Sequence, residues 1–241
     1  MPTPLHSRIA ALVPSLTGWC SVEKANDLAL AIIKVRSSVS VEIGVWGGRS
    51  LIPMALAHQE QQHGLVWAID PWSPKASVEG YDKANSDWWG AQDHDLVYRN
   101  FIANLKAHAV EEYVRVVRMK SDDVEPPDNI GMLHLDGQHT DQTIRDVERF
   151  ATKVIPNGFC FVDDIHWSGG GVERGVEKLL TLGFVKLFVR DTGAMFQRIA
   201  AKKPTPKPAP GKVEKAKTPK PKKRQKFRVA KPQKQLEAAV A

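Results

Sequence analysis

Three aspartates stand where two apolar runs of this 241-residue chain stop. The first run, residues 130–135, ends at Asp136, and the second, residues 159–162, ends at Asp163 and Asp164. In an open parallel α/β sheet the carboxyl ends of the strands share one edge, and ligands bind there. We therefore expect the three carboxylates to meet at that edge around a cation. Oxygen donors suit a hard divalent ion, and Mg²⁺, Mn²⁺ and Ca²⁺ all fit the pattern.

A glycine-containing turn follows an earlier apolar run, in the sequence EIGVWGGRS at residues 42–50. Gly44 and Gly48 let the backbone turn tightly beside a ligand, and the next helix begins with free N–H groups. The spacing departs from the G-x-G-x-x-G fingerprint and Glu42 would repel a pyrophosphate, which argues against a nicotinamide-dependent oxidoreductase. Asp70 ends the next apolar run, where an acid can bind ribose hydroxyls. The pattern predicts a cationic nucleoside cofactor, the alternative being a plain turn with Asp70 as a helix cap.

The elements that must position these residues alternate between strand and helix. Short apolar runs predict strands at residues 39–43, 65–69, 114–119, 130–135 and 159–162, with helices between them. Residues 184–189 and 194–199 predict a closing antiparallel hairpin. The alternation indicates an α/β fold, a Rossmann-like doubly wound and mostly parallel seven-stranded sheet with a C-terminal antiparallel hairpin.

Charge is unevenly distributed along the chain. Residues 201–241 hold 14 Lys and Arg against 2 acids, whereas residues 1–200 hold 20 basic and 25 acidic residues. Seven prolines in this tail and few apolar side chains predict disorder. The tail could solubilise the chain, act as a nuclear address, or contact polyanions without sequence specificity. Two cysteines and the lack of any membrane-length apolar run predict a cytoplasmic protein without a membrane span.

The combined motifs resemble the class I S-adenosylmethionine-dependent methyltransferases. Within that class, the chain is similar to the small-molecule O-methyltransferases of the macrocin O-methyltransferase-like and catechol O-methyltransferase-like group. The matching positions are Glu42, Gly44, Gly48, Ser50, Ala68, Asp70, Asp136, Gly137, His139, Asp146, Gly158, Asp163 and Asp164. The resemblance covers residues 38–200 and makes them the methyltransferase domain, with a helical extension at 1–37 and the basic tail at 201–241. The chain lacks an N-P-P-Y-type tetrapeptide after residue 135, which argues against methylation of the amino group of adenine or cytosine.

This resemblance implies roles for individual residues. Glu42, Gly44, Gly48 and Ser50 would surround the methionine part of S-adenosylmethionine. Asp70 would hold the ribose, and Ser121 and Asp122 would lie near the adenine. Asp136, Asp163 and Asp164 would hold the divalent metal, most simply Mg²⁺.

The expected reaction is methyl transfer to a hydroxyl of a small molecule. A bound cation stabilises an alkoxide, and His139 is the candidate general base because its side chain titrates near neutral pH. His139 could instead cap the helix expected from residue 140. Trp72, Tyr81, Trp88 and Trp89 suit a lid over the acceptor.

Two other functions remain open from the sequence. One is an RNA or protein methyltransferase recruited by the basic tail, and the other is a non-catalytic module that keeps the cofactor fold. The sequence also leaves the subunit count open, a homo-oligomer included.

Overall fold

A seven-stranded mixed sheet forms the centre of the computed structural model, which describes residues 3–200. The strands lie in the order β3-β2-β1-β4-β5-β7-β6, with the first five parallel and β7 antiparallel to both of its neighbours. Their bounds are β1 Val39–Ile43, β2 Leu65–Ile69, β3 Val114–Val117, β4 Ile130–Leu135, β5 Val154–Val162, β6 Phe184–Arg190 and β7 Gly193–Arg198. The predicted fold class, including the closing hairpin, is confirmed.

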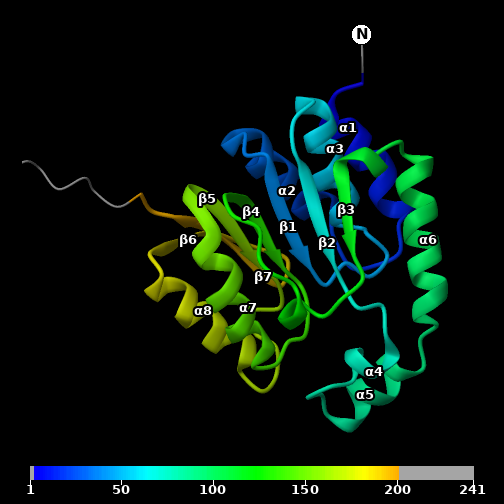
Figure 1. Ribbon diagram of the computed structural model, residues 1–241, viewed down its shortest axis with the longest axis vertical. Coiled ribbons are helices and arrows are strands. Elements are labelled where there is room, and N and C mark those ends of the chain that lie inside the picture. Colours follow the sequence, from blue (N-terminus) through cyan, green and yellow to red (C-terminus); the bar gives the residue numbers. More distant parts are fainter. Residues whose placement is uncertain (1–2, 201–241) are drawn as a thin grey trace, which may run out of the picture. The chain divides into compact units, whose positions relative to one another are not determined.

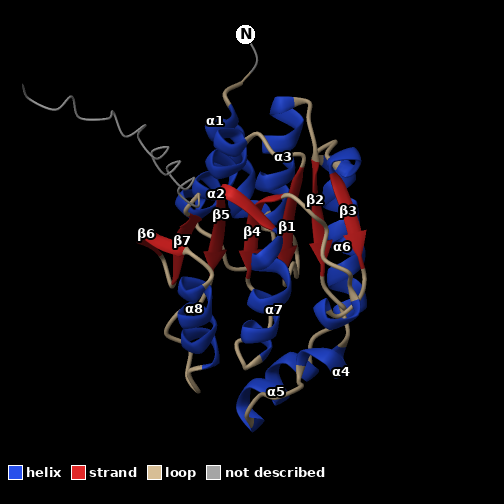
Figure 2. Cartoon of the chain, turned by 60° about the vertical axis from the view of Figure 1, so that its left-hand side comes forward, coloured by secondary structure: helices blue, strands red, loops and turns tan. Residues whose placement is uncertain are grey.

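Helices cover both faces of this sheet (Figures 1 and 2). One face packs against α1 (Leu5–Leu12), α2 (Val22–Val35), α3 (Leu51–Gln61) and α6 (His94–Ala107). The other packs against α7 (Gln142–Phe150) and α8 (Gly171–Thr181). The 3₁₀ turns are η1 Val13–Ser15, η2 Glu111–Tyr113, η3 Ser121–Asp123 and η4 Ala151–Lys153.

The alternation of side chains along the central strands decides which residues can meet. Val41 and Ile43 of β1 point into the core under α7 and α8. Glu42 lies between them and must point to the opposite face, under α2 and α3. Strand β4 is in register with β1, so His134 lies directly beside Glu42. A carboxylate and an imidazole are therefore neighbours inside the α2 side of the sheet.

The segment after β2, which carries the four aromatic residues of the expected lid, forms two short helices, α4 (Pro74–Ser77) and α5 (Lys83–Gly90). Asp82 caps α5 by accepting a hydrogen bond from the Asn85 N–H. In Figure 1 both helices lie beyond the carboxyl ends of the strands. Trp72 lies outside any lid, since it is buried and stacks on Phe101 at 5.3 Å between ring centroids.

The other boundaries agree with the sequence to within a few residues, except that β5 begins five residues earlier than expected, at Val154. No helix within residues 3–200 is both long and apolar enough to cross a membrane. The predicted tail at 201–241 lies outside the described residues.

Candidate active site

A cleft of about 1220 Å³ opens at the carboxyl ends of β1, β2, β4 and β5. Its walls include most of the residues singled out from the sequence: Gly44, Ser50, Asp70, Ser121, Asp122, Asp136, His139, Asp163 and Asp164. Glu42 and Gly48 are not part of its lining. The N-terminal extension also contributes to the walls, through Gly18, Trp19 and Lys24. The topology therefore brings the glycine turn and the acidic residues to one cavity.

The glycine turn is tied to Asp70. Oδ2 of Asp70 accepts hydrogen bonds from the backbone N–H groups of Val45 and Trp46, each at 3.0 Å. Oδ1 accepts from the N–H of Trp72 at 2.6 Å. Burial raises the pKa of Asp70 while these three hydrogen bonds oppose that rise. Asp70 thus fixes the shape of the turn and still faces the cleft.

Both predicted glycines are required by close packing. Gly44 has φ +86°, and a Cβ there would lie 2.0 Å from the carbonyl oxygen of Asp136. Gly48 has φ +83°, and a Cβ there would lie 2.6 Å from the Phe101 ring. Any other residue would strain the backbone at either position.

Glu42 is completely buried behind the turn. Its Oε1 accepts hydrogen bonds from the Ser50 hydroxyl and from Nδ1 of His134. Burial opposes a charge on His134, but Asp163 and Glu42 outweigh it and raise the His134 pKa to about 9. Oε2 of Glu42 has no hydrogen-bond partner within the described chain.

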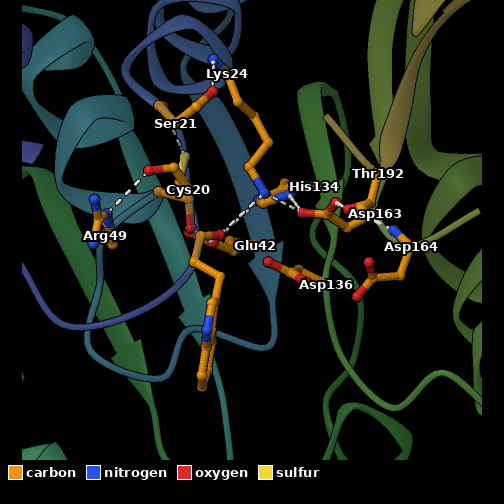
Figure 3. A network of polar contacts seen from close by, with 12 residues as sticks. Cys20, Ser21, Lys24, Glu42, Arg49, His134, Asp136, Asp163, Asp164 and Thr192 are labelled. Carbon is orange, nitrogen blue, oxygen red and sulfur yellow. Dashed lines mark hydrogen bonds and ion pairs between the residues drawn. The ribbon is translucent and has the colours of Figure 1, made fainter. Parts of the chain in front are cut away.

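Lys24 and Asp163 form a buried ion pair, with only 4% of each side chain exposed. Figure 3 shows the Lys24 side chain extending to His134 and Asp163. Burial disfavours the charge on Lys24, but Asp136 and Asp163 overcome this and raise its pKa. For Asp163, burial is likewise outweighed, here by His134 and Lys24, so that its pKa is lowered. Asp163, one of the three predicted metal ligands, is therefore already paired with Lys24.

Asp136, His139 and Asp164 form a second group, and Asp136 also lies close to the buried Glu42 and His134. The Nε2 atom of His139 lies 3.7 Å from Oδ1 of Asp136 and 3.4 Å from Oδ2 of Asp164. One donor atom from each residue lies within 4.8 Å of the others. Burial and the neighbouring Asp163 raise the pKa of Asp136 to about 6. Asp136 and its neighbours outweigh the effect of burial on His139 and raise the His139 pKa.

Gln142 organises the end of the cleft near β3. Its Nε2 donates to Oγ of Ser121 at 3.2 Å, to Oδ1 of Asp122 at 2.9 Å and to Oδ1 of Asp146 at 3.1 Å. The predicted adenine residues, Ser121 and Asp122, therefore lie at one end of the cleft, with Asp136 in the same lining. Asp146, also matched by the resemblance, is buried behind them.

Four tryptophans gather at the mouth of the cleft. Trp89 of α5 lies 5.2 Å from Trp46 and 4.7 Å from Trp88, measured between ring centroids and both edge-on. Trp19 of the N-terminal extension stacks on Trp46 at 6.5 Å. His139 and Trp167 also line the cleft, with 4.8 Å between their ring centroids. The cleft thus has aromatic walls beside its acidic centre, and Trp88 and Trp89 lie where the lid was expected.

The fold is that of the class I methyltransferases, as shown by the strand order of the sheet together with the closing antiparallel hairpin and the cleft at the strand ends. Residues 41–165, more than half of the chain, match a protein family described as "Methyltransferase domain". The chain belongs to this family and is an S-adenosylmethionine-dependent methyltransferase. A comparison with curated proteins found no match.

Solved structures of O-methyltransferases share the fold. NovP has 18% identity and a TM-score of 0.60, over 74% of this chain and 79% of that one. TomG from Streptomyces achromogenes, solved with S-adenosylmethionine, has 15% identity and a TM-score of 0.54, over 83% and 92%. The O-methyltransferase from Bacillus cereus, solved with S-adenosylhomocysteine, has 13% identity and a TM-score of 0.53, over 83% and 93%.

Two residues of the site were missed from the sequence. His134 sits inside an apolar run, and its place beside Glu42 follows from the alternation and register of β1 and β4. Lys24 lies in an amphipathic helix 139 residues from its partner, and nothing local to the sequence identifies it.

Proposed function

We propose that this methyltransferase transfers its methyl group to a hydroxyl of a small molecule, with a divalent ion organising the acceptor. The observation that carries the proposal is the group formed by Asp136, His139 and Asp164, which shares one cleft with the glycine turn and Asp70. O-methylation needs such a group because a protonated hydroxyl is a poor nucleophile.

The cofactor would occupy the part of the cleft between the glycine turn and Gln142. Asp70 would accept hydrogen bonds from the ribose, since three N–H groups leave one of its lone-pair positions free. Ser121 and Asp122 would face the adenine. Ser50 and the turn at Gly44 would border the methionine part, and Glu42, buried behind them, would hold the Ser50 hydroxyl in place.

The acidic group fits a divalent cation on the chemistry of its donors. Two carboxylates, Asp136 and Asp164, converge, and Nε2 of His139 beside them is buried without a hydrogen-bond partner within the described residues, so it stays available as a base. Such a donor set accommodates Mg²⁺ or Mn²⁺. The ion, when bound, would lower the pKa of the acceptor hydroxyl and hold its oxygen in place.

The residues of this chain would supply position and proton transfer. The acceptor oxygen attacks the methyl carbon in line with the breaking bond to sulfur, so holding the two reactants in this geometry lowers the barrier. Asp136 and Asp164 would hold the ion. Nε2 of His139, 3.7 Å and 3.4 Å from their carboxylates, would take the hydroxyl proton as the C–O bond forms and the bond from methyl carbon to sulfur breaks. The tryptophans at the mouth would exclude water and provide apolar contact for the acceptor.

A labelled-methyl screen tests this function. Full-length protein is incubated with S-adenosylmethionine carrying a labelled methyl group and a panel of sugars, phenols and amines, with Mg²⁺ or EDTA. We expect label in a hydroxyl-derived ether, identified by mass spectrometry, and a fall in turnover with EDTA. Label found only on nitrogen, or only on RNA or protein added to the same assay, would reject O-methylation of a small molecule.

A further inference from the structure

We propose that Lys24 is a built-in cation that occupies Asp163, leaving Asp136 and Asp164 as the carboxylate ligands of the divalent ion. This inference rests on the proposed function for the presence of an ion, and it concerns which residues hold that ion and how tightly. Lys24 acts here as a positioning residue, because it acts through Asp163.

Both carboxylate oxygens of Asp163 already accept hydrogen bonds. Oδ2 accepts from Nζ of Lys24, and Nε2 of His134 lies 3.6 Å from the same oxygen. Oδ1 accepts from the Asp164 N–H and from the Thr192 hydroxyl, each at 3.1 Å. A carboxylate has about four lone-pair positions. A metal ion at Asp163 would therefore have to compete with the Lys24 ammonium for a carboxylate that is only 4% exposed.

The other two aspartates are different. Within residues 3–200, neither Asp136 nor Asp164 has an ion pair with a lysine or arginine. The group that can carry a positive charge within ion-pair distance of both is His139, whose Nε2 donates no hydrogen bond. Lys24 acts on Asp136 at longer range, and each shifts the pKa of the other. The side chains of Asp136 and Asp164 are 23% and 25% exposed, against 4% for Asp163. These two carboxylates therefore stay accessible to an ion entering from the cleft.

Lys24 comes from helix α2, which precedes the first strand, and several contacts hold it in place. It lies in the first turn of α2, where Ser21 caps the helix by accepting from the Lys24 N–H at 3.0 Å. The ammonium also donates to the carbonyl oxygen of Trp19 at 3.2 Å. Arg49 anchors the preceding loop through the carbonyl oxygens of Gly18 and Cys20. An ammonium fixed in this way is a permanent positive charge beside the ion site.

Charge then sets the affinity of the site. Three free aspartates would attract a divalent ion strongly, whereas Lys24 cancels one of these charges and repels the incoming cation. Removing the ammonium should both free Asp163 as a further oxygen ligand and remove the repulsion. We expect the site to bind metal more tightly without Lys24.

Metal binding is measured directly on the full chain with Mn²⁺ and S-adenosylhomocysteine, from the free-ion EPR signal and by calorimetry. The variants are Lys24→Met, the double variant Lys24→Met/Asp163→Asn, and Lys34→Met as a control lysine at the other end of α2. Lys24→Met should lower the Mn²⁺ dissociation constant at least tenfold. The double variant should return to within threefold of wild type, and Lys34→Met should not change it.

Unchanged or weaker Mn²⁺ binding by Lys24→Met would overturn the inference. So would a large loss of affinity on introducing Asp163→Asn alone, because Asp163 would then be a ligand while Lys24 is present. If circular dichroism shows that Lys24→Met does not fold, Lys24→Gln gives the same test with a neutral polar side chain. The hydroxyl screen on wild type decides the proposed function separately, since Mn²⁺ affinity is measured without turnover.

Discussion

Nδ1 of His134 lies 3.0 Å from Oε1 of Glu42, and both side chains are completely buried. The two residues are paired in register on β1 and β4. Nε2 of His134 faces Asp163, which in turn binds Lys24. Alternating acidic and basic groups therefore run from the glycine turn to α2 beneath the cleft. This arrangement links the cofactor turn, the acidic centre and the N-terminal extension.

The first prediction concerns the stability of this pair. Glu42→Ala should lower the free energy of unfolding by about 3–5 kcal/mol, because it leaves a buried cationic imidazole without its carboxylate. Urea denaturation measures the change. Ser50→Ala removes only one hydrogen bond to the same carboxylate and should cost about 1 kcal/mol. Equal and small losses for both variants would show that the pair contributes little.

The second prediction concerns Asp70. Asp70→Ala removes the acceptor of three N–H groups that shape the turn, along with the proposed ribose contact. The dissociation constant of S-adenosylhomocysteine, measured by calorimetry, should rise at least tenfold, or about 1.4 kcal/mol. Asp128→Ala is the control, since Asp128 is exposed and pairs with Lys153. Unaltered cofactor affinity in Asp70→Ala would remove this residue from the ribose role.

The strands and the location of the cleft could be predicted from the sequence because buried parallel strands are short apolar runs that stop at polar residues. Asp136 and Asp163 mark those ends, and the fold class brings such ends to one edge. The packing around them could not be predicted in the same way. Trp72 is one of the aromatic residues expected in a lid, yet it is buried against Phe101.

The roles within the acidic group depend on long-range contacts. In the sequence motif Asp163 and Asp164 are equivalent. In the structure Asp163 pairs with Lys24, whereas Asp164 lies beside His139. Both residues follow the end of β5 at Val162, and the chain leaves the extended conformation at Asp164, which has φ +48°. The lysine that meets Asp163 comes from a helix whose position relative to the sheet is set by tertiary packing.

The third prediction is a pH dependence of stability from Asp146. Burial raises the pKa of Asp146 from 3.8 to about 6, against hydrogen bonds from Ser121 and Gln142. Between these two values the folded state binds the proton more tightly than the unfolded chain, so this group's contribution to stability falls as pH rises. Across that pH window this group should lower the unfolding free energy of the wild type by an amount on the order of 1–3 kcal/mol. Asp146→Asn should not show this decrease. Urea denaturation of both proteins from pH 4 to about pH 7 measures it, and parallel curves would contradict the assignment.

The fourth prediction separates catalysis from binding at His139. His139→Gln should lower turnover of a hydroxyl acceptor by about 10²–10⁴-fold, as expected for loss of a general base. Cofactor affinity should stay within about twofold, because the cofactor would be held by the turn and Asp70. His166→Gln is the matched control, being exposed and outside the cleft lining. Full activity in His139→Gln would show that another group is the general base.

The last prediction concerns the tryptophans at the mouth. Trp89 contacts Trp46, Trp88 and Trp19, so it is the centre of the aromatic wall that we expect to hold the acceptor. Trp89→Ala should raise the KM of an acceptor found in the hydroxyl screen about tenfold, since a lost aromatic contact removes on the order of 1–2 kcal/mol. Trp89→Phe keeps an aromatic face and should recover most of that affinity. The dissociation constant of S-adenosylhomocysteine should change in neither variant. A rise in this constant together with KM would instead place Trp89 at the cofactor, and an unchanged KM would show that the acceptor binds elsewhere in the cleft.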